Sequence, residues 1–218
     1  MSLALFDLDN TLIAGDSDYE WGKWLVHKNK VDKDHYKRMN EQFYQDYEAG
    51  VLDIYAYLDF ALAPLAQIEP AELDALHREF MEQIIAPMWL PSAEKLLAKH
   101  REKGDLLVII SATNRFIVEP ICHKLGVEEI IATEPERING RYTGKVSGVP
   151  SYQQGKVERL QDWLQKRHET LQGSYFYSDS INDLPLLQLV DNPVAVNPDS
   201  KLKAEAQVQA WPIMSLRG

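Results

Sequence analysis

The chain of 218 residues combines 45% hydrophobic with 26% charged residues, a globular composition that excludes a largely disordered protein. Its formal net charge of -10 argues against general nucleic-acid binding, because an acidic surface repels phosphate backbones. A single cysteine, Cys122, excludes an internal disulfide framework and a zinc site built on cysteines.

The length suits one domain, or one domain that carries a smaller insert. No apolar run approaches the roughly 20 residues of a membrane-spanning helix. The first ten residues, MSLALFDLDN, lack a basic start and reach an acidic residue at Asp7, so they do not predict a signal peptide. We therefore expect a cytoplasmic protein with no membrane partner.

Three apolar runs are too short for helices and predict buried strands. They are Leu3–Phe6, Leu106–Ile110 and Ser174–Tyr177, and small polar or acidic residues follow each. Helical stretches separate them, which indicates an α/β fold with a Rossmann-like, doubly wound parallel sheet. In such sheets ligands bind beyond the carboxyl ends of the strands.

Residues 14–86, between the first two strands, show long amphipathic stretches and little strand signal. We expect helices over Ser17–Lys28, Lys33–Glu48, Asp53–Ala66 and Ala71–Ile85. The segment holds 15 acidic against 7 basic residues, and 11 of the 21 aromatic residues. This shift predicts an inserted all-helical cap at 14–86 and a catalytic core formed by residues 1–13 and 87–218.

The remaining elements follow the second strand. A helix is expected over Asn114–Leu125, and Asn139-Gly140 predicts a type I′ hairpin turn. Ser151–Gln154 has a capping-box pattern that would start a helix reaching about His168, with Lys156 in its first turn. Two further strands are expected over Pro193–Val196 and Ala210–Ile213.

Asp7 and Asp9 stand two residues apart where the first strand ends, so their side chains would share a face. Two carboxylates that close repel each other unless a proton or a cation such as Mg²⁺ lies between them. A solvated acidic turn is the alternative. An EF-hand loop is excluded, because Leu12 and Asp18 stand where the loop needs Gly and Glu.

Asp179 and Asp183 form a second carboxylate pair after the third strand, before a helix expected near Ile181. Capping of that helix by Asp179 or Ser180 is the alternative explanation.

Ser111 ends the second strand where a helix begins, so its hydroxyl and the N–H groups that follow could bind phosphate. Neither this pattern nor Lys156 is by itself specific for phosphate binding. Ser, Thr and Asn often cap helices, and most lysines on helices are solvated.

The combination is more specific than its parts. Phe6–Leu12, then Ser111, then Lys156, then Asp179 with Asp183 resemble, in this order, the four motifs of the haloacid dehalogenase superfamily in its phosphatase branch. The helical insert is similar to the cap of the phosphoserine-phosphatase-like subfamily. One departure is Ser178, where many relatives have Gly. The resemblance implies a Mg²⁺-dependent phosphomonoester hydrolase.

The resemblance also implies residue roles. Asp7 would be the nucleophile that forms an aspartyl-phosphate, and Asp9 the general acid and base. The metal would be held by Asp7, the Asp9 carbonyl and Asp179, with Asp183 acting directly or through water. The phosphoryl oxygens would be held by Ser111, the Ala112 N–H and Lys156. The alternatives are a phosphotransferase using the same intermediate, and a non-enzyme that binds phosphorylated ligands.

The resemblance extends to the substrate. It places Asp16 where an acid contacts the substrate amine, and Asp59 and Ala61 where phosphoserine phosphatases carry arginines. A cap without these arginines suits a small cationic, flat leaving group, and we expect L-histidinol phosphate, with phosphoserine as the alternative. The expected specificity residues are Asp16, Asp18, Glu20, Trp21 and Asp59. The alternative is that these acids are solvated and the aromatic residues are core. The sequence leaves the oligomeric state open.

Overall fold

The computed structural model describes residues 2–217 and contains one seven-stranded sheet with the order β4-β3-β2-β1-β5-β6-β7. The strands are β1 (Leu3–Phe6), β2 (Leu106–Asn114), β3 (Glu129–Ile138), β4 (Arg141–Ser147), β5 (Tyr175–Ser178), β6 (Asn192–Val196) and β7 (Ile213–Met214). All neighbours pair in parallel except β3 and β4. The expected Rossmann-like parallel sheet is confirmed, with one antiparallel edge strand.

One group of helices lies between β1 and β2 in the chain, and the remaining helices alternate with the later strands. The helices are α1 (Ser17–His27), α2 (Lys33–Ala49), α3 (Ile54–Gln67), α4 (Pro70–Phe80), α5 (Pro91–Glu102), α6 (Arg115–Lys124), α7 (Gln154–Arg167), α8 (Leu184–Leu187) and α9 (Ser200–Val208). Shorter turns are the π-helical Met81–Ile85 and the 3-10 turns Ala86–Met88 and Ile181–Asp183. Among residues 2–217, each helix is too short or too polar to span a lipid bilayer.

The core forms because strand side chains alternate between the two faces of the sheet. Leu3 and Leu5 of β1 pack with α7, α8 and α9, whereas Ala4 and Phe6 pack on the other face with α5 and α6. β1 lies at the centre of the sheet, hydrogen bonded to β2 and β5. The residues that follow these three strands therefore meet at one edge.

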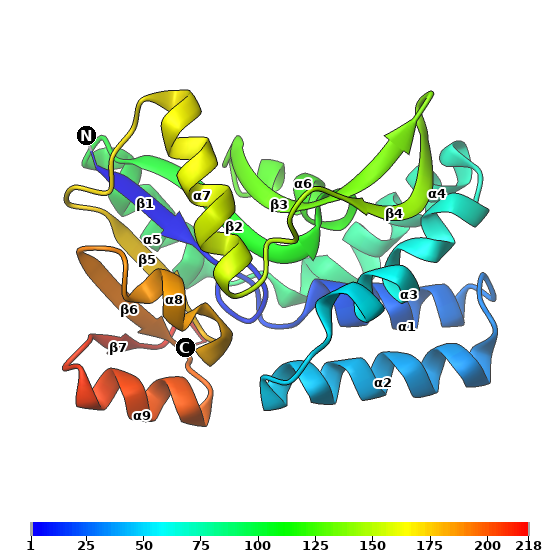
Figure 1. Ribbon diagram of the computed structural model, residues 1–218, viewed down its shortest axis with the longest axis horizontal. Coiled ribbons are helices and arrows are strands. Elements are labelled where there is room, and N and C mark those ends of the chain that lie inside the picture. Colours follow the sequence, from blue (N-terminus) through cyan, green and yellow to red (C-terminus); the bar gives the residue numbers. More distant parts are fainter. Residues whose placement is uncertain (1, 218) are drawn as a thin grey trace.

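Helices α1 to α4 gather beyond the carboxyl end of β1 (Figure 1). The hairpin of β3 and β4 reaches the same region, where Gly144 packs closely against Ala63 and Ala66 of α3. Asn139 and Gly140 both have positive φ angles, 52° and 81°, which confirms the turn expected there. The hairpin thus supports the helical insert, although its sequence lies outside residues 14–86.

Several predicted boundaries are wrong. β2 continues past the expected end at Ile110 to Asn114, because Asn114 still pairs with Thr133 of β3, so Ser111 lies inside the strand and α6 starts at Arg115. The helix expected over Ala71–Ile85 leaves the α-helical pattern after Phe80 and continues as a π-helical turn, and Pro87, which has no N–H for a helical ladder, lies in the 3-10 turn that follows. The capping box does not form: α7 starts at Gln154, and the Ser151 N–H donates to the Thr133 hydroxyl instead. The last strand begins at Ile213 rather than Ala210, which has a positive φ of 55°.

Candidate active site

Asp7 lies at the end of β1 in contact with the buried ammonium group of Lys156. Lys156 Nζ lies 2.7 Å from Asp7 Oδ1 and 2.7 Å from Asp183 Oδ1, and all three residues are buried. The Ser178 hydroxyl donates to Asp183 Oδ2 at 2.7 Å. The departure from Gly at this position therefore supplies a hydrogen bond that orients Asp183.

Thr11 connects the two carboxylates that follow β1 and β5. Its hydroxyl oxygen lies 3.3 Å from Asp7 Oδ2 and 3.1 Å from Asp179 Oδ1. Thr11 lies in the first motif, four residues after Asp7, but the sequence alone predicts no role for it. The Ser180 side chain, not Asp179, caps the following turn, so Asp179 remains directed to the site.

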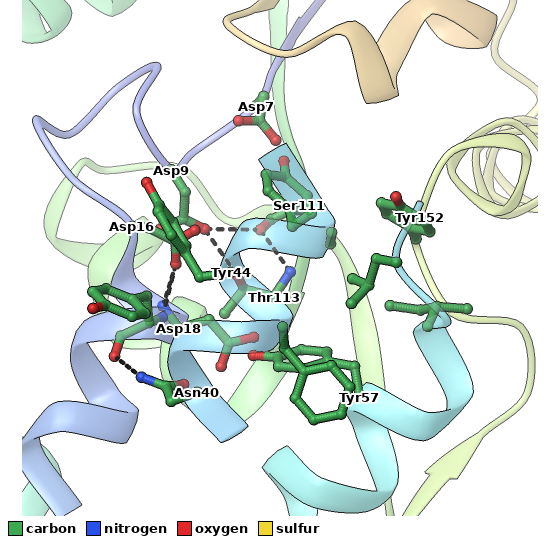
Figure 2. Close-up of a pocket in the computed structure, with 16 residues that line it drawn as sticks. Asp7, Asp9, Asp16, Asp18, Asn40, Tyr44, Tyr57, Ser111, Thr113 and Tyr152 are labelled. Carbon is green, nitrogen blue, oxygen red and sulfur yellow. Dashed lines mark hydrogen bonds between the residues drawn. The ribbon is translucent and has the colours of Figure 1, made fainter. Parts of the chain in front are cut away.

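Asp9 is held by groups from two elements. Its Oδ1 accepts a hydrogen bond from the Ser17 N–H at the start of α1 at 2.6 Å, and its Oδ2 accepts one from the Thr113 hydroxyl at 2.9 Å. The Ser111 hydroxyl lies 3.4 Å from the same Oδ2 and accepts from the Thr113 N–H (Figure 2). The sequence alone predicts no role for Thr113 either, because its side chain meets Asp9 only in the folded protein.

The pKa values of the site reflect several buried carboxyl groups around one buried cation, Lys156. Burial raises the pKa of Asp7 to about 7, with Asp183 and Asp9 adding to the shift and Lys156 opposing it. Burial and repulsion from Asp7 and Asp183 also raise the pKa of Asp179 well above its ordinary value. Burial alone would lower the pKa of Lys156, but the charges of Asp183 and Asp7 outweigh it and raise this pKa.

The donor set fits Mg²⁺. Within residues 2–217, no three His, Cys, Asp or Glu side chains converge as a ready-made metal cluster. Asp7 and Asp179 instead approach one common hydroxyl, and Asp183 is engaged by Lys156 and Ser178. Mg²⁺ suits two carboxylates completed by water and phosphate oxygens, whereas Ca²⁺ needs more protein oxygens.

A cavity of about 50 Å³ adjoins Asp7 and Asp9 (Figure 2). Its lining is mostly acidic or aromatic and comprises Asp7, Asp9, Asp16, Asp18, Tyr19, Asn40, Phe43, Tyr44, Tyr47, Leu52, Ile54, Tyr57, Ser111, Ala112, Thr113 and Tyr152. Of the described residues, those lining the cavity include no lysine, arginine or histidine. The cavity is therefore small and partly apolar, and its charged side chains are all acidic.

The structure brings two of the five expected specificity residues to this cavity, Asp16 and Asp18. Glu20 points to an ion pair with Lys23, and Trp21 is buried against Phe80. Asp59 is exposed on α3 and does not line the cavity. Trp21 differs from the expectation because the inward face of α1 packs into the core, and Glu20 and Asp59 differ because their side chains lie on helix faces outside the cavity.

The fold and site define the class of the protein. The sequence profile of the haloacid dehalogenase-like hydrolases matches residues 4–188. The chain belongs to this family, and its relatives identify it as a phosphatase.

The chain is 50% identical over 220 residues to a histidinol-phosphatase of Neisseria meningitidis, with 99% of each protein covered. It is 30% identical to phosphoserine phosphatase SerB1 of Mycobacterium tuberculosis, covering 98% of this chain and 70% of that protein.

Two solved structures are similar over the full length. A protein with unknown function from Bordetella pertussis has a TM-score of 0.93 at 41% identity, with 99% and 98% of the two chains covered. A phospho-aspartyl intermediate analogue of phosphoserine phosphatase has a TM-score of 0.71 at 18% identity, with 99% and 93% covered. At this identity, the second likeness shows the fold alone.

Proposed function

We propose that this phosphatase hydrolyses L-histidinol phosphate through an aspartyl-phosphate on Asp7, with Mg²⁺ as its cofactor. The observation that carries the proposal is the cavity beside Asp7, which presents the carboxylates of Asp16 and Asp18 and lacks a cationic residue. Histidinol phosphate has an amine and an imidazole and no carboxylate. The name of the N. meningitidis relative supports the same substrate.

Asp7 would attack phosphorus, and the bond from phosphorus to the alkoxide leaving group would break. Asp9, fixed by Ser17 and Thr113, would donate a proton to that alkoxide and then take one from the water that hydrolyses the aspartyl-phosphate. Ser111, the Ala112 N–H and Lys156 would hold the phosphoryl oxygens. The buried ammonium of Lys156 would offset the negative charge there, because preformed charges are most effective in a site that excludes water.

Asp7, the Asp9 carbonyl and Asp179 would hold the metal. Bound Mg²⁺ would neutralise charge on the phosphoryl group and on Asp7. Asp183 would act through Lys156, since both its oxygens contact that ammonium group. We propose that residues 14–86 form the cap and that residues 1–13 with 87–218 form the catalytic core, with the β3–β4 hairpin supporting α3.

Phosphoserine is the alternative substrate. Its carboxylate would enter a cavity whose charged side chains are all acidic, and like charges placed together oppose binding. A phosphotransferase would share the first half of the reaction, and measuring released inorganic phosphate separates it from a hydrolase.

The test is a comparison of kcat/KM for histidinol phosphate and phosphoserine with Mg²⁺ present. We expect histidinol phosphate to be preferred by at least roughly tenfold, which is about 1.4 kcal/mol of transition-state binding. Asp7→Asn should lower turnover of both substrates by several orders of magnitude, because it removes the attacking carboxylate. A preference for phosphoserine would contradict the substrate, and a folded, active Asp7→Asn enzyme would contradict the mechanism.

A further inference from the structure

Asp16 and Asp18, the two acids that residues 14–86 contribute to the cavity, form different hydrogen bonds. One oxygen of Asp16, Oδ1, caps α1 by accepting hydrogen bonds from the Asp18 N–H at 3.0 Å and the Tyr19 N–H at 2.8 Å. Asp18 caps no helix, and its carboxyl interacts with the Tyr57 hydroxyl of α3 instead. Asp18 therefore presents a carboxyl that no backbone group of α1 occupies.

The two acids also lie at different places in the cavity. Figure 2 shows Asp16 beside Asp9, and Asp18 on the side toward Tyr57. The charge of Asp9 is the main charge acting on Asp16, whereas the Tyr57 hydroxyl acts on Asp18 more strongly than Asp9 does. A leaving group that extends from Asp7 would thus meet Asp16 before it meets Asp18.

The wall around Asp18 is aromatic. Phe43 of α2 meets Tyr57 edge to face, with ring centroids 5.4 Å apart and planes at 71°. Both residues line the cavity together with Leu52 and Ile54. A flat ring that carries an N–H group at its edge would pack on these side chains and donate that N–H to a carboxyl.

We propose that Asp18 and the Tyr57 hydroxyl form a second recognition site, which binds the imidazole N–H of the leaving group while Asp16 binds its amine. This assignment depends on the proposed function, because it needs a substrate with both groups. Burial raises the pKa of Asp18 to about 7, close to that of a free imidazole, and groups of similar pKa share a proton readily. Asp18 and Tyr57 are then specificity residues, since neither touches the phosphoryl group.

The experiment measures kcat/KM for histidinol phosphate and for O-phosphoethanolamine, which has the amine but no ring. The variants are Asp18→Asn and Tyr57→Phe, which change little in shape, with Asp16→Asn for comparison. Asp18→Asn and Tyr57→Phe should lower the ratio of the two kcat/KM values by at least tenfold, through loss on histidinol phosphate. Asp16→Asn should lower both values. Asp59→Asn, an exposed acid on the same helix as Tyr57, is the matched control and should change neither.

The outcomes are distinguishable. If the wild-type enzyme does not prefer histidinol phosphate to phosphoserine, the proposed function fails before any variant is considered. If the wild type shows that preference but Asp18→Asn and Tyr57→Phe leave the ratio unchanged, or lower both values equally, only the second recognition site is overturned. Circular dichroism of each variant establishes that it is folded.

Discussion

Single carboxyl groups in this site are buried at a cost in stability. Asp18 shows this most clearly, because it lies outside the expected metal site and faces Asp9, Asp16, Tyr36 and Tyr57. Its pKa is about 7 in the folded protein and 3.8 ordinarily, so folding disfavours its ionised form. Between these values the unfolded chain releases the proton that the folded chain keeps, and stability decreases as the pH rises.

Asp18→Asn should therefore stabilise the protein in a pH-dependent manner. The melting temperature of the variant should exceed that of the wild type at pH 8, above the folded pKa. The difference should be smaller at pH 5 and vanish below about pH 4, where both states hold the proton. Asparagine can still accept from the Tyr57 hydroxyl, so that contact remains. Thermal denaturation followed by circular dichroism at these pH values measures the effect, and a constant difference across the range would contradict it.

Among the elements, the start of α7 governs the position of Lys156. Gln153 precedes the helix with an unusual backbone, φ 46° and ψ −118°, and Gly155 follows in the first turn. A methyl group on Gly155 would collide with the carbonyl oxygen of Pro150 and lie 3.3 Å from Val149 Cγ1. The close approach of backbone to backbone here explains why glycine precedes Lys156.

Gly155→Ala should lower both stability and kcat. The collision is with backbone, so either α7 or the Pro150 segment must move, and Lys156 would move away from Asp7 and Asp183. Small displacements of a catalytic group can reduce turnover about 100-fold, so we expect a loss of at least roughly tenfold in kcat. Steady-state kinetics and thermal denaturation test this. Gln154→Ala, at the exposed neighbouring position, is the control.

At the scale of the whole molecule, the buried carboxylates near the carboxyl ends of β1 and β5 repel one another, and this repulsion lowers the stability of the fold unless cations offset it. Asp7, Asp179 and Asp183 share Lys156 as their buried cation. The rest of the fold, with apolar layers on both faces of the sheet, supplies the stability that tolerates this cluster.

Mg²⁺ should raise the melting temperature and be required for activity. At 100 times its Kd, a ligand of the folded state adds about 2.7 kcal/mol, which corresponds to roughly 5–10 °C in a protein of this size. EDTA should reverse the shift and abolish turnover, and Ca²⁺ should restore turnover poorly. Asp179→Ala should lose most of the Mg²⁺-dependent shift. An equal shift in Asp179→Ala would place the metal elsewhere, which differential scanning fluorimetry can detect.

Local patterns in the sequence determined the elements and the motif residues. Three short apolar runs predicted β1, β2 and β5, because buried parallel strands are continuous and apolar. Since the carboxyl ends of parallel strands lie at one edge of a sheet, the fold class alone predicted that Asp7 and Asp179 share that edge. The aromatic and acidic content of residues 14–86 indicated a separate helical insert in the same way.

Only the tertiary structure decided which of residues 14–86 face the cavity. Asp16 and Asp18 line it, whereas Glu20 pairs with Lys23 and Asp59 is exposed. Composition cannot distinguish them, because all four are acids in or next to amphipathic helices. The contacts of Thr11 with Asp179 and of Thr113 with Asp9 join residues 168 and 104 positions apart. Such contacts depend on how the strands and loops come together in space, which local sequence patterns do not encode.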